Sequence, residues 1–344
     1  MRPWMESISL TLRARLLPGR LLEVTMHDAD PDLPDELAAK LTKVPILVTG
    51  GTGFIGSRLV ARLQRAGADV TVLTRDAQRA RQVTGTAAKL VTDMQAAASN
   101  TPRMVVNLAG AGIADRPWTE ARRRLLLDSR VAFTRQLREA LEATPPEAII
   151  NASAVGYYGT DAEQTFAEDD GPGSGFAADL CRQWEEEAQA FAALGSRVVR
   201  LRIGLVLGPG GLLGRMKLPF SLGLGGRIGD GRQWMSWVHL DDVLGLIERC
   251  LTDRTLSGAI NATAPEPVTN ARFTATLGKV LSRPTIFPVP AFVLSTLLGD
   301  MADELLLSGA RVLPQRAMDN GYVFDQPDLE GAMRAALGRP APTP

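Results

Sequence analysis

The chain has 344 residues, enough for a substantial buried core and for roughly two domains, or one large domain with a lobe. Its 38 lysine and arginine residues balance 38 aspartate and glutamate residues, so no overall charge would draw it to nucleic acid or to an anionic membrane. The chain has only two cysteines and two histidines, which argues against a disulfide framework and a metal site. No apolar run approaches the roughly 18 residues of a membrane span. Together these features favour a cytoplasmic protein.

Residues 1–43 are expected to form a flexible or loosely packed N-terminal extension, because the acidic run HDADPDLPDELAAK is broken by prolines and has no sustained apolar period. From 44 onward the pattern changes. Short β-rich runs, among them PILVT, DVTVLT and RVVRLRI, alternate with helices predicted at 58–66, 119–141 and 177–194. This alternation predicts βαβ units and a doubly wound parallel sheet.

We place the first domain at 44–255, including glycine-dense loops after Gly204 and a helix through Leu251 that Asp241 would cap. Residues 256–338 are expected to form a smaller C-terminal α/β lobe. Residues 339–344 would be a tail.

Three glycines, Gly50, Gly53 and Gly56, follow the first predicted strand directly and open the next helix. They would allow a tight turn, a close approach of backbone N–H groups to a pyrophosphate, and close helix packing. Phe54 and Ile55 lie between them. Because the strand and the helix that confirm such a motif are both present, we expect an NAD(P)-binding Rossmann domain.

The end of the second strand indicates which dinucleotide would bind. Thr74 and Arg75 stand where an acidic residue would hold the ribose of NAD, and a guanidinium suits the 2′-phosphate of NADP(H). Asp76 follows at once, and a register shifted by one residue would favour NAD(H) instead. Asp93 is placed to meet the adenine amino group, and Leu108, Ala109 and Gly110 would face the cofactor with their backbone.

The chain resembles the extended short-chain dehydrogenase/reductases, the epimerase/dehydratase group. The motifs that carry this resemblance are VTGGTGFIGSRL, NLAGAGI, NASAVGYYG, RIGLVLGPGG and GDGRQWMSWVHLDDV. Within that group, the chain is similar to an atypical, nucleoside-diphosphate-sugar epimerase-like branch whose C-terminal domain has no assigned function. The segments that carry this similarity are PFSLGLGGRIGDGRQWMSWVHLDD and PVTNARFTATLGKVLSRP. The resemblance covers about 44–338. It implies a small polar substrate, such as a nucleotide sugar or carbonyl compound, and a homodimer formed through the helices at 119–141 and 177–194.

The catalytic Tyr-xxx-Lys pair of that family is absent, because the residues four positions after the three tyrosines are Asp161, Ala162 and Gln326. Phe176 or Ala177 takes the tyrosine place, and Leu180 or Cys181 the lysine place. The candidate catalytic residues that remain are Ser153, Tyr157 and Tyr158, with a tyrosine as general acid. Alternatively, Ser153 bonds only to backbone and the tyrosines line the pocket.

The resemblance also implies that the GRQWMSWVH segment lies on the substrate side. Arg232, Trp234, Trp237 and His239 are the candidate residues there, since indole and guanidinium groups stack on sugar or base rings. The tryptophans could equally be core residues, and the histidine could orient a loop. The sequence thus favours an NADP(H)-dependent oxidoreductase or epimerase-like enzyme. The alternative is a non-catalytic NADP(H)-binding regulatory or scaffold protein.

Overall fold

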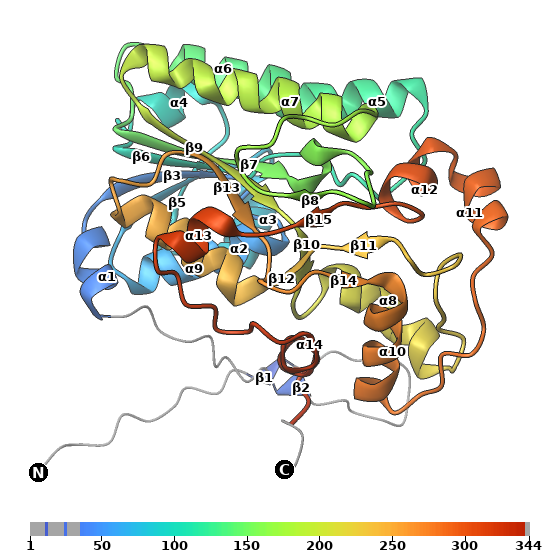
Figure 1. Ribbon diagram of the computed structural model, residues 1–344. Coiled ribbons are helices and arrows are strands. Elements are labelled where there is room, and N and C mark those ends of the chain that lie inside the picture. Colours follow the sequence, from blue (N-terminus) through green and yellow to red (C-terminus); the bar gives the residue numbers. More distant parts are fainter. Residues whose placement is uncertain (1–10, 13–23, 26–34, 341–344) are drawn as a thin grey trace, which may run out of the picture.

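A seven-stranded parallel sheet forms the centre of the computed structural model, which describes residues 11–12, 24–25 and 35–340 (Figure 1). The strand order β13-β9-β7-β6-β3-β4-β5 starts in the middle at β3 and winds outward in both directions, which confirms the predicted Rossmann fold. The strands are β3 (Pro45–Thr49), β4 (Asp69–Leu73), β5 (Lys89–Val91), β6 (Met104–Asn107), β7 (Ala148–Ala154), β9 (Arg197–Ile203) and β13 (Gly258–Ala262).

Helices cover both faces of this sheet, which is why most residues of its strands are apolar and buried. In β3, Ile46 and Val48 belong to one apolar cluster and Leu47 to another on the opposite face. On the first side lie α1 (Asp35–Leu41), α2 (Phe54–Arg65), α3 (Ala77–Thr84), α9 (Leu240–Thr252) and α13 (Gln315–Asp319). On the other lie α4 (Met94–Ala98), α5 (Glu120–Leu127), α6 (Phe133–Ala140) and α7 (Phe176–Gln189).

A smaller α/β lobe follows the central sheet, with an apolar core that includes Trp237 and Phe273 (Figure 1). Three pairs of short strands tie it together: β10 (Leu205–Leu207) with β12 (Trp237–His239), β11 (Trp234–Met235) with β14 (Val268–Thr269), and β8 (Thr165–Phe166) with β15 (Arg311–Val312). Its helices are α8 (Gly211–Ser221), α10 (Asn270–Leu281), α11 (Ala291–Leu298), α12 (Asp300–Leu305) and α14 (Leu329–Ala336).

The expected domain limits need two adjustments. The seventh strand, β13, begins at Gly258, beyond the boundary placed at 255, so the sheet continues into the segment assigned to the lobe. Most of the expected extension lies outside the described residues, but β1 (Thr11–Leu12) pairs with β2 (Val24–Thr25), and the fully buried Leu41 ends α1 inside the main core.

The helices also differ from their predicted limits. The helix expected at 119–141 is α5 and α6 joined by a π-helical turn, Asp128–Ala132. The helix expected at 177–194 is α7 followed by a 3₁₀ turn, Ala190–Leu194. Helix α9 starts at Leu240, and its cap is His239 and not the expected Asp241. Within the described ranges, no helix is both long and apolar enough to cross a membrane.

Candidate functional site

Two glycines at the turn from β3 into α2, Gly50 and Gly56, have no room for a side chain. Gly50 has φ +68°, and a Cβ there would lie 2.5 Å from the carbonyl oxygen of Leu108 in the loop after β6. At Gly56 a Cβ would come within 2.2 Å of the Gly50 carbonyl oxygen. These contacts bring the backbone of two loops together at the carboxyl edge of the sheet, where its winding direction changes.

The amino end of α2 has no side-chain cap. Its N-cap residue is Gly53, and no acidic residue lies in the first turn. The first backbone N–H groups of a helix lack partners within that helix, and the helix dipole favours negative charge there. The two features together make this end of α2 suited to a pyrophosphate.

Asp76 and Arg75, which follow β4, differ in their contacts with the rest of the protein. Asp76 caps α3, its Oδ1 accepting a hydrogen bond from the backbone N–H of Arg79 at 2.9 Å. The Thr74 hydroxyl accepts from the Asp76 N–H at 3.2 Å. Arg75 is exposed, and within the described chain nothing pairs with its guanidinium. The Arg75 cation is therefore available to a ligand at this strand end, whereas the Asp76 carboxylate already uses one oxygen to cap α3.

Asp93 also caps a helix. Its Oδ1 accepts from the N–H of Ala96 at 2.7 Å at the start of α4. Its second carboxylate oxygen has no partner among the residues that the structure describes, and the side chain is exposed. In the loop after β6, the Leu108 N–H donates to Thr49 at 3.2 Å, so this loop is fixed to the strand that precedes the glycines.

A buried amide network beneath these loops was not foreseen. Asn107 accepts a hydrogen bond from the Thr49 hydroxyl at 2.6 Å and donates to Asn151 at 2.6 Å and to Thr134 at 2.9 Å. The Trp184 indole N–H donates to the same Thr134 hydroxyl at 3.0 Å. The network joins β3, β6, β7, α6 and α7, and so fixes the strand ends that carry the loops.

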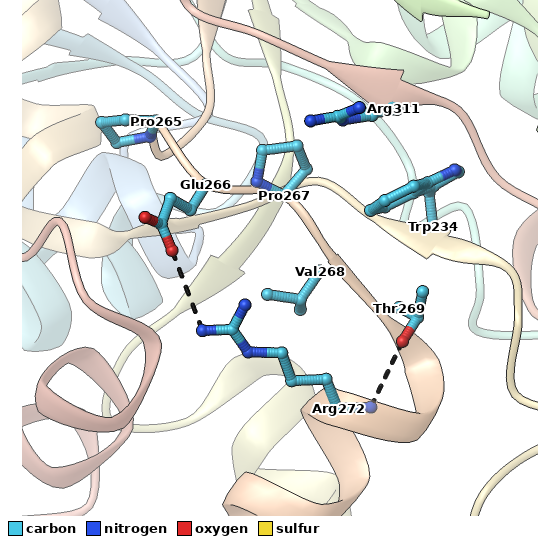
Figure 2. A pocket seen from close by; sticks show the side chains of 8 residues that line it. All are labelled: Trp234, Pro265, Glu266, Pro267, Val268, Thr269, Arg272 and Arg311. Carbon is cyan, nitrogen blue, oxygen red and sulfur yellow. Dashed lines mark hydrogen bonds and ion pairs between the residues drawn. The ribbon is translucent and has the colours of Figure 1, made fainter. Parts of the chain in front are cut away.

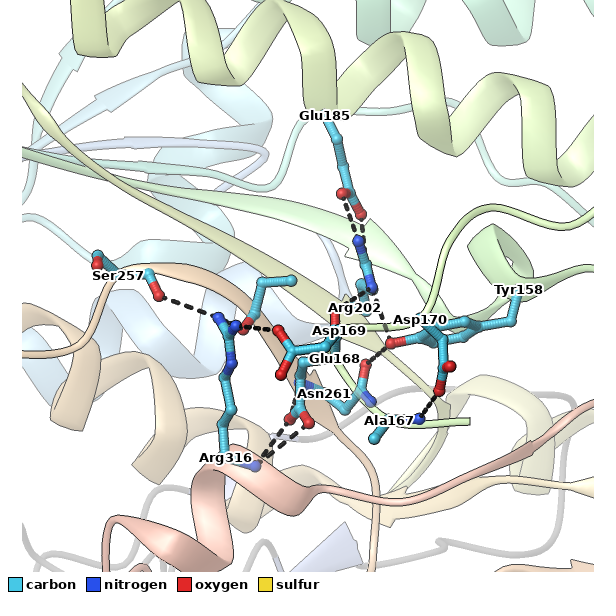
Figure 3. Close-up of polar contacts among 11 residues, drawn as sticks. Tyr158, Ala167, Glu168, Asp169, Asp170, Glu185, Arg202, Ser257, Asn261 and Arg316 are labelled. Atoms are coloured by element: carbon cyan, nitrogen blue, oxygen red, sulfur yellow. Dashed lines mark hydrogen bonds and ion pairs between the residues drawn. The ribbon is translucent and has the colours of Figure 1, made fainter. Parts of the chain in front are cut away.

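Ser153 and Tyr158 lie in a second buried network, on the β7–β9–β13 side of the sheet. Figure 3 shows its members Tyr158, Arg202 and Glu185. The Ser153 hydroxyl donates a hydrogen bond to Glu185 at 2.7 Å. The Arg202 guanidinium donates to both oxygens of the same carboxylate, at 2.8 and 2.9 Å. Arg202 also donates to the Tyr158 hydroxyl at 2.8 Å, and that hydroxyl donates to Asn261 at 2.8 Å. The structure thus brings two of the three candidate catalytic residues into one hydrogen-bonded chain.

The two tyrosines have different surroundings. Tyr158 is 1% exposed and stacks on Phe166, and burial raises its pKa to about 12 although Arg202 opposes the shift. Tyr157 is partly exposed, and the Arg202 guanidinium lies 3.5 Å from its ring centroid. Only Tyr157 therefore has both an accessible surface and a cation at its ring.

The amino end of α7, where the family tyrosine belongs, is occupied by a carboxylate. Glu304 from α12 accepts from the N–H groups of Phe176 and Ala177 at 3.0 and 2.8 Å. One turn further on, Cys181 is buried, which raises the pKa of its thiol to about 11. A thiol in this state is a poor nucleophile, so Cys181 is a packing residue.

Trp234 is the substrate-side candidate that lines an open pocket, of about 460 Å³ (Figure 2). The Arg311 guanidinium lies 5.1 Å from the Trp234 ring centroid, and the indole N–H donates to the Ala162 carbonyl at 2.9 Å. Arg272 stands on another wall, 3.8 Å from Glu266. One wall of the pocket, residues 265–269, directly follows the carboxyl end of β13.

The other substrate-side candidates lie elsewhere. Trp237 is completely buried and donates its indole N–H to the Glu266 carbonyl at 3.0 Å, so it belongs to the lobe core and offers no surface to a substrate. His239 is buried as well, and its Nδ1 accepts from the Asp241 N–H at 3.3 Å. Arg232 is exposed and does not line the pocket of Trp234.

Sequence reasoning did not foresee the contacts that connect these groups. Glu185, Arg202, Asn261 and Arg311 come from four separate segments, and no local spacing brings them together. The one available signal was charge, since Arg202 lies between the apolar Leu201 and Ile203 near the end of β9 and Glu185 follows a tryptophan on an apolar helix face. A charge in such a place needs a partner.

Comparison with known proteins agrees with this geometry. Residues 46–262, more than half of the chain, match the NAD dependent epimerase/dehydratase family, and residues 289–336 match a domain of unknown function, DUF1731. Epimerase family protein YfhF of Bacillus subtilis is 39% identical over 84% of this chain and 96% of its own length. Epimerase family protein SDR39U1 of Homo sapiens is 36% identical over 84% of this chain and 98% of its own length.

Two solved structures give the same architecture. The crystal structure of human SDR39U1 (isoform 2) with NADPH has a TM-score of 0.77 at 34% identity and covers 85% of this chain and 99% of that one. MoeE5 in complex with UDP-glucuronic acid and NAD, at 23% identity and a TM-score of 0.69 over 86% of this chain and 98% of that one, shares the fold alone. The chain therefore belongs to the NAD dependent epimerase/dehydratase family, in a branch with the DUF1731 domain at its carboxyl end.

Proposed function

We propose that the protein binds NADP(H) across the carboxyl ends of β3, β4 and β6, with NADPH preferred to NADH. The uncapped amino end of α2 beside Gly50 and Gly53 is the observation that carries this proposal, because backbone amides and the helix dipole there favour a pyrophosphate. The structure of human SDR39U1 with NADPH supports the choice of cofactor.

The neighbouring residues fit the remaining parts of such a cofactor. Arg75 would pair with the 2′-phosphate, since its guanidinium is exposed and has no partner among the described residues. Thr74 would add a hydroxyl contact. The carboxylate oxygen of Asp93 that does not cap α4 would accept a hydrogen bond from the adenine amino group. Backbone atoms of 108–110, with Phe54 and Ile55 from α2, would line the groove.

The 2′-phosphate assignment is tested with Arg75→Gln. Loss of one charge-assisted pair of about 1.5–3 kcal/mol should weaken NADPH binding roughly tenfold to a hundredfold. NADH, which lacks the phosphate, should bind the variant as it binds the wild type. Arg81→Gln, which removes an exposed arginine from the last turn of α3, is the matched control and should change neither affinity. Equal weakening of NADPH and NADH by Arg75→Gln would contradict the assignment.

We further propose that the protein is an oxidoreductase or epimerase-like enzyme. Bound NADPH would supply the hydride. Of the candidate catalytic residues, Tyr157 is the proposed proton donor because it is accessible and Arg202 lies at its ring. Ser153 and Tyr158 would support the site through Glu185 and Arg202. Tyr157→Phe should abolish NADPH oxidation with a carbonyl substrate that the wild type turns over, and unchanged turnover would exclude this role.

The pocket at Trp234 is proposed to receive a phosphorylated substrate such as a nucleotide sugar. Its indole face would stack on a ring, and Arg311 and Arg272 would pair with phosphate oxygens. Titration with UDP-glucose and with glucose tests this, and only the nucleotide sugar should bind. Arg311→Gln should weaken that binding about tenfold. Arg227→Gln, at an exposed arginine that does not line the pocket, should have no effect, and binding that survives Arg311→Gln would contradict the proposal.

The second candidate function is a non-catalytic NADP(H)-binding regulator. The specific observation in its favour is the burial of Ser153 and Tyr158, whose hydroxyl protons both go to protein acceptors. Following NADPH oxidation across a panel of carbonyl compounds and nucleotide sugars separates the two functions. Turnover that depends on Tyr157 supports the enzyme, whereas NADPH binding without turnover of any compound supports the regulator.

A further inference from the structure

Arg130 is a cation placed against the loop after β6 by an unusual backbone feature. It lies in the π-helical turn between α5 and α6, and such turns are frequent at functional sites. Its guanidinium rests directly on Gly110, where an added Cβ would lie 2.9 Å from the arginine Cζ. Gly110 belongs to the loop that follows β6 and faces the proposed cofactor.

The contacts of Arg130 are with neutral groups. Nη2 donates to the Ala111 carbonyl at 2.9 Å, and Nη1 has only long contacts of 3.5 Å, to the Leu126 carbonyl and the Ser129 hydroxyl. The guanidinium also covers the Trp184 ring, 5.2 Å from its centroid. Across 35–340, no carboxylate pairs with Arg130. The buried Arg62 and Arg202, in contrast, are paired with Glu248 and Glu185.

This leaves hydrogen-bond capacity unused. A guanidinium has five N–H donors, and the Nε–H and one Nη2–H of Arg130 have no acceptor among the described residues. The Nε atom is not among the fully buried unpaired atoms, and the side chain is partly exposed, so the Nε–H reaches an accessible surface. Desolvation lowers the pKa of Arg130, yet an arginine stays charged at physiological pH. A hydrogen-bond acceptor on a ligand would satisfy the unused N–H donors of Arg130.

The position of Arg130 relates it to the missing lysine. Leu180 or Cys181 occupies the lysine place on α7, and Cys181 lies close enough to Arg130 for the guanidinium charge to oppose the burial that raises the thiol pKa. Trp184, one turn further along α7, stacks on the same guanidinium. The cation thus enters the space between α7 and the β6 loop from a different helix.

We propose that Arg130 replaces the absent lysine as the cation that holds the nicotinamide ribose of NADPH. This inference rests on the proposed NADP(H) binding. The Nε–H and Nη2–H groups donate to ribose hydroxyl oxygens while the Ala111 carbonyl fixes the guanidinium. Because arginine does not release its proton, it positions the ribose and cannot take part in a proton relay, which is consistent with the loss of the paired tyrosine.

Calorimetric titration with two ligands tests the inference. NADPH contains the nicotinamide ribose, whereas 2′,5′-ADP contains only the adenosine half with its 2′-phosphate. Arg130→Gln should weaken NADPH about tenfold and leave 2′,5′-ADP within about twofold of the wild type. Arg130→Lys, which keeps the charge, should recover part of the NADPH affinity. Arg75→Gln should weaken both ligands, and Arg124→Gln on the exposed face of α5 should weaken neither.

Three results would overturn the inference. Unchanged NADPH affinity in Arg130→Gln, with the wild type binding normally, would refute the role of Arg130 and leave the proposed function standing. Equal losses of NADPH and 2′,5′-ADP in both Arg130 variants would indicate a purely structural role. Wild-type protein that binds neither ligand would refute the proposed function and the inference together. Circular dichroism of each variant reports whether it is folded.

Discussion

Glu185 and Arg202 form a two-pronged ion pair in the interior, with Nε and Nη2 donating to the two carboxylate oxygens at 2.8 and 2.9 Å. Both side chains are almost completely buried. The Ser153 hydroxyl donates a hydrogen bond to Glu185, and the Tyr158 hydroxyl accepts one from Arg202. The polar groups that sequence reasoning assigned to catalysis therefore also hold α7 against β7 and β9.

Replacing Glu185 with alanine should lower the free energy of unfolding by about 3–5 kcal/mol, because it leaves Arg202 buried without its counter-ion. Urea unfolding followed by circular dichroism gives the measurement. Glu186→Ala is the matched control on the same helix, because its exposed pair with Arg182 contributes at most about 1 kcal/mol. Similar losses in the two variants would contradict the account of the buried pair.

Gly50→Ala should destabilise the fold and remove NADPH binding. A side chain at φ +68° is strained, and its Cβ would push the Leu108 carbonyl away from the groove. We expect a loss of about 1–3 kcal/mol of stability and an NADPH affinity too weak to measure. Gly214→Ala in α8 has open space around the new methyl group and should bind NADPH normally. Normal binding by Gly50→Ala would contradict the close approach of the two loops.

Tyr158→Phe should reduce stability more than it reduces cofactor binding. The change removes the hydroxyl between Arg202 and Asn261 and leaves both without that partner, at a cost of about 1–3 kcal/mol. Because the ring still stacks on Phe166, the site should keep its shape, and NADPH affinity should stay within about twofold of the wild type. A variant of wild-type stability, measured in urea, would be inconsistent with the buried network.

Asp242 should make stability depend on pH. Its buried carboxylate accepts from the N–H groups of Asp325 and Gln326, and burial raises its pKa to about 6. The folded state therefore holds the proton more tightly than the unfolded chain, whose aspartate pKa is about 4. The resulting stabilisation is complete below about pH 4 and is lost as the pH rises through about 6.

Asp242→Asn removes this titration and serves as the reference. Between pH 4 and pH 7, the wild type should lose up to about 3 kcal/mol of unfolding free energy relative to the variant. The lost carboxylate contact shifts the variant equally at every pH. A difference that stays constant with pH would show that the Asp242 carboxyl titrates normally.

The sequence was sufficient for the sheet and for the glycine loop, because apolar runs such as PILVT and the spacing of Gly50, Gly53 and Gly56 are local signals. Strand β13 fell outside the expected boundary because only its pairing with the distant β9 identifies it as part of the sheet. The cap of α9 differed because His239 Nδ1 takes the role that aspartate usually has.

The interior of the candidate site depends on long-range contacts. Nothing near Ser153 in the sequence indicates that its hydroxyl meets Glu185. For Trp237 the sequence left a substrate contact and a core position equally open, and the packing of β12 places it in the lobe core. The π-helical turn that aims Arg130 at Gly110 interrupts a sequence pattern that otherwise predicts one continuous helix. Such features arise from tertiary packing, which overrides local preference.

The central claim is that the glycine loop and Arg75 bind NADP(H). Titration of the purified protein with NADPH and with NADH, followed by energy transfer from its five tryptophans to the reduced nicotinamide, tests it most directly. We expect saturable, tight binding of NADPH and much weaker binding of NADH. Failure to bind either nucleotide would contradict the account.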